Sequence, residues 1–122
     1  MKVQCLAPQL RTTDLDTAIE FYTGKLEFAL SFHYGDFYAG VDIGGFRLHL
    51  KLVDTTDPGI AFVRNGQHLH LHFTVEDLPA VFDRLRQAEV TIVENICERP
   101  WGMMEFVIED PDGHTIYLAE AK

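Results

Sequence analysis

The sequence predicts an α+β fold made of two βαβββ modules, whose curved mixed sheets form a cleft for a small molecule. Three observations support this prediction. A helix-like pattern occurs twice in the 122-residue chain, one strand-like run precedes each copy, and three strand-like runs follow it. One helix cannot cover both faces of a four-stranded sheet, so each module is expected to leave one sheet face for a partner or a ligand.

The two helix-like segments repeat the same apolar spacing, i, i+3, i+4 and i+7, at a distance of 63 positions. An aspartate precedes each segment, Asp14 before the first and Asp77 before the second, which suits the positive end of a helix. Pro79 is suited to a first helical turn. The apolar positions are Leu15, Ala18, Ile19 and Tyr22 in the first segment, and Leu78, Val81, Phe82 and Leu85 in the second.

Glycine-containing turns at 43–46 and 110–113 predict hairpins between the last two strands of each half. The largely polar segment 54–67 is interpreted as a linker or as a loop over the pocket. We therefore expect one domain, 1–122, with a first module at about 1–54, a linker at about 55–67 and a second module at about 68–122. The predicted strands cover residues 3–11, 28–34, 37–43 and 46–53 in the first half, and 68–75, 90–96, 103–109 and 114–120 in the second.

The charge balance limits the choice of partners. Ten basic and nineteen acidic residues give a net charge of −9, which repels phosphate backbones and anionic lipids, so neither nucleic acid nor a membrane is an expected partner. The N-terminus lacks the apolar stretch of a signal peptide, and a cytoplasmic location is expected. Cys5 and Cys97 are too few for a disulfide framework and are expected to be reduced core residues.

Histidines are concentrated in two of the predicted strands. His68, His70 and His72 alternate along one run, and alternate residues of a strand point to the same face. His49 lies in another run, between two leucines. A single histidine is more often a surface or core residue than a metal ligand, so it is the cluster of four histidines that indicates a possible site.

The internal repeat relates four positions to one another. The helix offset of 63 matches Ala7 with His70, and alignment of the two hairpins matches His49 with Tyr117. These four residues are expected to occupy equivalent places in the two modules and to form the floor of the pocket.

A resemblance to a known family rests on three segments, TTDLDTAIEFYTGKLEF, HLHFTVEDLPAVFDRLR and RPWGMMEFVIEDPDGHTIYLAE. Their order and spacing resemble the vicinal oxygen chelate superfamily, which includes glyoxalase I, extradiol dioxygenases, fosfomycin-resistance proteins and bleomycin-binding proteins. The resemblance covers nearly the whole chain and implies paired βαβββ modules. It also implies a homodimer, because family members of this length commonly complete their clefts across a dimer interface.

In the metal enzymes of this family, four strands each supply one His or Glu ligand to a divalent ion. The resemblance places those positions at Ala7, His49, His70 and Tyr117, so two match and two do not. Ala7 has no donor atom, and Tyr117 would have to bind as a phenolate, so no metal is favoured. Zn, Ni, Mn or Fe bound by His49 and His70 is the alternative, with His68 or His72 as a substitute ligand.

Two functions follow from this comparison. The first is a small-molecule-binding protein of the bleomycin-resistance type, in which His49, His70, Trp101, Tyr117 and Tyr38 line the site and the bound drug is sequestered without reaction. We expect more than half of the aromatic candidates to be packing residues, with Trp101, in a loop-like stretch, as the best exception. These aromatic candidates are Phe32, Tyr34, Phe37, Tyr38, Trp101 and Tyr117.

The second function is catalytic. His49 and His70 would bind a divalent ion in a glyoxalase-type lyase or isomerase, or in a dioxygenase-like enzyme, and Glu105 would move the proton. A metal-free enzyme that uses histidines as acid and base is a third reading. The sequence does not specify the ligand.

Overall fold

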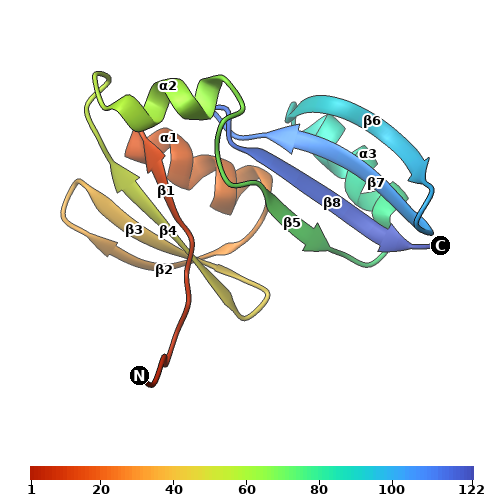
Figure 1. Ribbon diagram of the computed structural model, residues 1–122, viewed down its shortest axis with the longest axis horizontal. Helices are drawn as coiled ribbons and strands as arrows, with labels where there is room; N and C mark the ends of the chain where they lie inside the picture. The colour runs from red at the N-terminus through yellow and green to blue at the C-terminus, as the bar shows by residue number, and fades with distance from the viewer. The chain divides into compact units, whose positions relative to one another are not determined.

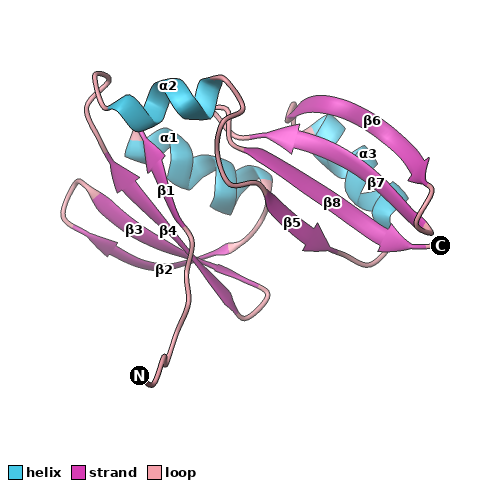
Figure 2. Cartoon of the chain, viewed as in Figure 1, coloured by secondary structure: helices cyan, strands magenta, loops and turns pink.

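The computed structural model describes residues 1–122, and the chain divides into two compact units, Met1–Ala61 and Phe62–Lys122 (Figure 1). Each unit contains one four-stranded sheet and a helix packed against it (Figure 2). The first unit contains β1 (Gln9–Thr12), α1 (Leu15–Glu20), a π-helical turn η1 (Phe21–Lys25), β2 (Ala29–Tyr34), β3 (Tyr38–Ile43) and β4 (Phe46–Leu52). Helix α2 (Pro58–Arg64) crosses the boundary, and the second unit continues with β5 (Leu71–Thr74), α3 (Leu78–Gln87), β6 (Thr91–Arg99), β7 (Met103–Glu109) and β8 (Thr115–Ala121).

The two sheets have the same topology. The strand order is β1-β4-β3-β2 in the first and β5-β8-β7-β6 in the second. In each sheet the first strand pairs in parallel with the last, and all other pairs are antiparallel. The α+β fold with two βαβββ modules and mixed sheets is therefore confirmed. No helix has the length and apolar character needed to span a membrane.

Strand register confirms the repeat at the level of single residues. Gln9 is the partner of His49 across β1 and β4, and His72 is the partner of Tyr117 across β5 and β8. Gln9 and His72 are 63 positions apart, which is the offset between the two helices. His49 and Tyr117 are 68 positions apart, which is the offset between the two hairpins. His49 and Tyr117 thus hold equivalent places in the two sheets.

The aspartates at the helix starts act as predicted. The Asp14 carboxylate accepts a hydrogen bond from the Thr17 amide, and the Asp77 carboxylate accepts one from the Ala80 amide. Glu120 accepts two further bonds from the first amides of α3, at Asp77 and Leu78. These side chains satisfy amides that have no partner within a helix.

Each helix covers one face of its sheet. Helix α1 contacts β3 and β4, and α3 contacts β6, β7 and β8. Because successive side chains of a strand point to opposite faces of the sheet, every second side chain lies under the helix, and this set is mainly apolar. The side chains between them lie on the opposite face of the sheet, which we call the distal face. The buried residues beneath the helices are Leu10, Ala39, Val41, Leu48 and Leu50 in the first sheet, and Leu71, Phe106, Ile108, Ile116 and Leu118 in the second.

Several local predictions are wrong. The first strand of each unit is shorter than predicted, since residues 3–8 and 68–70 lie outside β1 and β5 and only four residues of each strand pair with their neighbour. The segment predicted as a linker contains α2, because Pro58 fits a first helical turn and Ile60 is buried. Cys5 is exposed rather than part of the core, because it precedes β1, whereas Cys97 is half-buried in β6.

Helix α2 begins at an ion pair that gives a testable pH dependence. The Asp57 carboxylate accepts a hydrogen bond from the Gly59 amide at 2.8 Å and forms an ion pair with Arg11 at 2.7 Å. The bonds from Gly59 and Arg11 lower the pKa of Asp57 below its ordinary value of 3.8. A carboxyl group with a lowered pKa stabilises the fold above its unfolded-state pKa, and this stabilisation is lost as the pH falls through the lowered value.

We expect Asp57→Asn to lower the melting temperature by a few degrees near neutral pH, and we expect the difference to shrink as the pH falls through the lowered pKa. Thermal unfolding followed by circular dichroism across that pH range measures this effect. Asp42→Asn is the matched control, because the exposed Asp42 side chain on β3 makes no hydrogen bond or ion pair. A difference that persists unchanged in acid would contradict the assignment.

Candidate functional site

The distal face of the first sheet carries an aromatic cluster around His49. Gln9, His49, Gly40 and Phe32 lie in one row across the four strands, because each is the register partner of the next. Tyr38 is next but one to Gly40 along β3 and therefore projects from the same face. The sequence places these residues on four separate strands, and only the sheet pairing brings them together.

The rings in this cluster are close and ordered. Phe32 and Tyr38 are stacked, with centroids 6.1 Å apart and planes 12° from parallel. The His49 ring meets Phe32 edge-on at 5.4 Å and Tyr38 at 5.5 Å. The guanidinium of Arg47 lies 5.8 Å from the centre of the Phe32 ring, within range of a cation–π contact. Phe32, Tyr38 and His49 are all half-buried, so each ring keeps some exposed surface.

A chain of hydrogen bonds orients His49. The Gln9 amide donates to the Tyr38 hydroxyl at 2.9 Å, and the same hydroxyl lies 2.9 Å from Nδ1 of His49. The hydroxyl can donate to Nδ1 or accept from it, so the bond fixes the orientation of the ring, and Nε2 makes no hydrogen bond within the protein. His49 therefore has Nε2 available for a ligand.

The distal face of the second sheet is polar where the first is aromatic. Tyr117 stacks against His72 at 6.5 Å, with ring planes 13° apart, and meets His70 edge-on at 5.7 Å. Nδ1 of His70 forms a hydrogen bond with the Thr115 hydroxyl. His70 and His72 are exposed and Tyr117 is half-buried, so this cluster is accessible.

Glu105, the predicted proton carrier, belongs to an ionic network on the same face. Its carboxylate accepts a bond from Arg99 Nε at 3.0 Å and lies 3.5 Å from His72 Nε2. Arg99 also pairs with Glu94 at 2.7 Å, and the hydrogen bonds that Arg99 donates to Glu94 and Glu105 raise the pKa of Arg99. Glu105 is buried, and its strongest partner is a guanidinium that remains charged. The sequence indicated Glu105 as a candidate but not its partners Arg99 and Glu94, which lie in the curved strand β6 (Figure 1).

The aromatic candidates are more exposed than predicted. None of the six is buried, because those on strands lie on distal faces or at strand ends, and Trp101 lies in the turn between β6 and β7. Trp101 is 67% exposed, as its loop-like surroundings indicate. None of the six therefore belongs to the buried core, and the expectation that more than half of them are packing residues stays a prediction.

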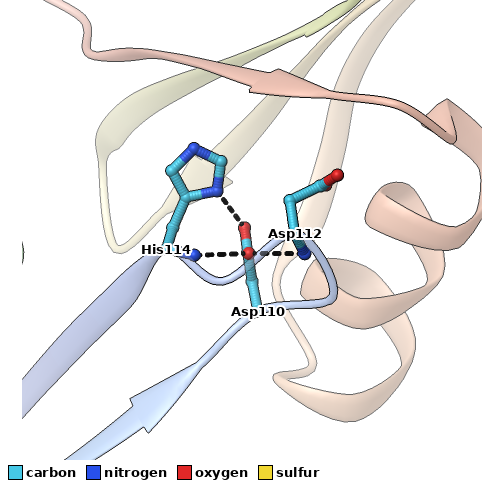
Figure 3. Close-up of side chains that lie close together, drawn as sticks. All are labelled: Asp110, Asp112 and His114. Atoms are coloured by element: carbon cyan, nitrogen blue, oxygen red, sulfur yellow. Dashed lines mark hydrogen bonds and ion pairs between the residues drawn. The ribbon is translucent and has the colours of Figure 1, made fainter. Parts of the chain in front are cut away.

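The turn between β7 and β8 contains a buried group of possible metal ligands, Asp110, Asp112 and His114, whose ligand atoms all lie within 4.8 Å of one another (Figure 3). The two oxygens of Asp110 are already engaged. Oδ1 accepts from the backbone amides of Asp112 and His114, and Oδ2 accepts from His114 Nδ1 at 2.8 Å. Figure 3 shows the Asp112 carboxylate directed away from these bonds. Asp110 therefore holds the turn and orients His114.

The four positions that the family resemblance assigns to metal ligands do not fit a metal centre of that kind. Ala7 is half-buried and has no donor atom, and the Tyr117 phenol ring lies against the His70 and His72 imidazoles. His49 lies in the first unit, whereas His70 and Tyr117 lie in the second. This donor set lacks the three or four nitrogen and oxygen ligands that a catalytic divalent ion requires.

One hollow of the first unit lies away from the predicted site. It has a volume of about 270 Å³ and is lined by residues at the start of α1 and by His33, Asp36 and Leu52. It contains none of the predicted site residues.

Comparison with known proteins identifies the family. The model for the Glyoxalase/Bleomycin resistance protein/Dioxygenase superfamily matches residues 4–118, and the chain belongs to this superfamily. No curated protein matches the sequence significantly.

Solved structures share the fold across nearly the whole chain. The UcmS2 structure is 26% identical, with a TM-score of 0.81, and the match covers 98% of both chains. The bleomycin-binding protein from bleomycin-producing Streptomyces verticillus, complexed with copper(II)-bleomycin, is 22% identical, with a TM-score of 0.75, covering 100% of this chain and 99% of that one. Lactoylglutathione lyase from Agrobacterium tumefaciens is 20% identical, with a TM-score of 0.71, covering 98% and 94%. The fold is thus shared with both a binding protein and an enzyme.

Gly40 allows the Phe32 ring to lie across the strand. A Cβ added at Gly40 would meet the ring at 2.1 Å, so Gly40→Ala is expected to displace Phe32 from Tyr38 without unfolding the sheet. Loss of the nuclear Overhauser contacts between these two rings measures the displacement. Gly24→Ala is the control, because the three atoms nearest to its Cβ would all belong to the flexible Glu20 carboxylate. Ring contacts that survive in Gly40→Ala would argue against this packing.

Asp110 is expected to be a strong stabilising residue. Asp110→Ala removes three hydrogen bonds in a buried turn and leaves His114 Nδ1 without its partner, so we expect a loss of about 2–4 kcal/mol in the free energy of unfolding. Urea denaturation measures this loss. Pro111→Ala, an exposed substitution in the same turn, is expected to change stability by less than about 1 kcal/mol. Equal effects of the two substitutions would contradict the role of Asp110.

Proposed function

We propose that this protein binds a small planar molecule without reacting with it, as a binding member of its superfamily. The observation that carries the proposal is the orientation of His49. Its Nδ1 is bonded to the Tyr38 hydroxyl, which leaves Nε2 available to a ligand beside the stacked rings of Phe32 and Tyr38. A flat ligand would gain stacking from the rings and a hydrogen bond with His49.

The second sheet supports the same reading. Tyr117 and His72 offer another pair of parallel rings at the equivalent row, and His70 lies beside them. Trp101 is an exposed aromatic that can close over a bound molecule from its turn. The net charge of −9 favours a neutral or cationic ligand over an anionic one. Sequestration of a drug is the role we propose, since a relative with this fold is a bleomycin-binding protein.

We further propose that the protein acts as a homodimer whose subunits together complete the ligand cleft. The support is the pair of distal faces, each with exposed rings that one helix per unit leaves uncovered. Light scattering at micromolar concentration tests this, and a monomer would remove the shared-cleft arrangement while leaving the single-face binding site in place.

The binding proposal predicts a specific loss of affinity. Bleomycin, with and without copper(II), and acridine orange, a planar cation, are the probes, and Trp101 fluorescence and calorimetry are the readouts. Phe32→Ala is expected to weaken binding about 3- to 10-fold, the value of one aromatic stacking contact. Phe46→Ala is the matched control, because Phe46 is an exposed phenylalanine of β4 whose position alternates to the other face. No binding of any probe, or equal loss in both variants, would contradict the proposed site.

The catalytic alternative makes a different prediction. A glyoxalase-type lyase that uses His49, His70 and Glu105 would require Nε2 of His49 to bind the metal while Nδ1 donates to the Tyr38 hydroxyl. Activity in a glyoxalase assay with added Zn²⁺ or Ni²⁺ that is abolished by His49→Gln and by Glu105→Gln would replace the binding proposal.

A further inference from the structure

The hydrogen-bond chain on the distal face of the first sheet begins at an exposed amide. Gln9 is bonded to the Tyr38 hydroxyl at 2.9 Å, and that hydroxyl lies 2.9 Å from Nδ1 of His49. Gln9 is exposed, whereas Tyr38 and His49 are half-buried. The three side chains share one face, because Gln9, His49 and Gly40 are register partners and Tyr38 is next but one to Gly40. The chain therefore connects an exposed amide to the imidazole of the proposed binding site.

Each group in this chain can act as a donor or as an acceptor. The Gln9 amide presents its NH2 group or, after half a turn, its carbonyl oxygen at the same place. The Tyr38 hydroxyl can donate one bond and accept others, and a neutral imidazole carries its proton on either nitrogen. Nδ1 of His114, in contrast, is bonded to the Asp110 carboxylate, which accepts and so keeps the proton on Nδ1. The chain from Gln9 to His49 contains no group that fixes its direction in this way.

Two complete bond patterns satisfy the same atoms. In the first, Gln9 donates to Tyr38, Tyr38 donates to Nδ1 of His49, and Nε2 carries the imidazole proton. In the second, Nδ1 donates to Tyr38, Tyr38 donates to the Gln9 carbonyl oxygen, and Nε2 has a lone pair. Each pattern contains two hydrogen bonds, so neither leaves the half-buried hydroxyl without a partner. Exchange rotates the amide and the hydroxyl and moves one imidazole proton from Nε2 to Nδ1 by way of water, so the net charge is unchanged.

We propose that this chain reverses as a unit, so that Nε2 of His49 donates a hydrogen bond to one ligand and accepts one from another. The inference rests on the proposed function, in which a flat ligand lies against the Phe32 and Tyr38 rings beside His49. It specifies the ligand class as flat heterocycles whose edge nitrogen is either a donor or an acceptor. Gln9 is a positioning residue, because it acts on the ligand through Tyr38 and His49.

Substitutions of Gln9 that allow one bond direction test the proposal in the free protein. Gln9→Glu offers acceptor atoms, so Tyr38 is expected to donate to it and the His49 proton is expected on Nδ1. Gln9→Lys offers donor atoms, so the proton is expected on Nε2. Nitrogen-15 chemical shifts of the His49 ring, measured at a pH where the ring is neutral, distinguish the two tautomers. We expect the shifts of the unsubstituted protein to lie between those of the two variants.

Two controls separate the bond chain from an effect of charge. Gln4→Glu makes the same change of charge at another exposed glutamine and is expected to leave the His49 shifts unchanged. Gln9→Glu combined with Tyr38→Phe keeps the charge near His49 but removes the hydroxyl, so the tautomer is expected to match that of Tyr38→Phe alone. A tautomer that neither Gln9 substitution changes, or one that follows the charge without the hydroxyl, would overturn the proposal.

Binding of three flat two-ring probes gives a second readout. Quinoline has an acceptor nitrogen, indole has a donor N–H, and naphthalene has neither. Gln9→Glu is expected to weaken quinoline binding about 3- to 10-fold, the value of one hydrogen bond, and Gln9→Lys is expected to weaken indole binding by the same factor. Naphthalene binding is expected to stay within about twofold in both variants.

The two readouts distinguish failure of this inference from failure of the proposed function. Absence of binding by all three probes would contradict the flat-ligand site, and the nitrogen-15 shifts of the free protein would still decide whether the chain reverses. Binding of all three probes with affinity ratios that are the same in both Gln9 variants would overturn the inference and leave the flat-ligand site in place.

Discussion

In each unit one helix must bury the apolar side of a four-stranded sheet, and the remaining features of the molecule depend on this constraint. Strand alternation sends every second side chain under α1 or α3 and every other one to the distal face. The buried set is aliphatic and aromatic, as at Leu48 and Leu50 or Ile116 and Leu118. The residues between them, His49 and Tyr117, are thereby obliged to lie on the opposite side. The position of the candidate site is a consequence of core formation.

The repeated topology supplies equivalent positions, but the side chains at those positions differ in chemistry. The row through His49 is aromatic and has glycine at its centre, so the Phe32 ring can lie across β3. The corresponding row through Tyr117 is bordered by a buried carboxylate and its guanidinium, Glu105 and Arg99. One face therefore offers stacking surfaces, and the other combines imidazoles with a satisfied ion pair.

The partner at Nδ1 separates two kinds of histidine in this chain. His49 faces a hydroxyl, which can donate or accept, so either of its nitrogens can carry the proton. His68 and His114 face a carbonyl and a carboxylate, and so keep a lone pair at Nε2. Spacing along a strand cannot predict which group is bonded to Nδ1 of each histidine, because several of these groups come from other parts of the chain.

The sequence by itself determined the two modules, the strand order along the chain, the aspartate caps at Asp14 and Asp77 and the match of His49 with Tyr117. These features follow from local periodicity and from a repeat, which are present in the order of the residues. It did not determine the length of β1, the helix α2 or the exposure of the aromatic residues, since each depends on pairing and packing between distant segments. Only the tertiary structure joined Gln9 to Tyr38, Arg99 to Glu105 and His68 to His114. The physical reason is that hydrogen bonds and ring contacts are short-ranged, so their partners are chosen by the folded sheet rather than by position in the chain.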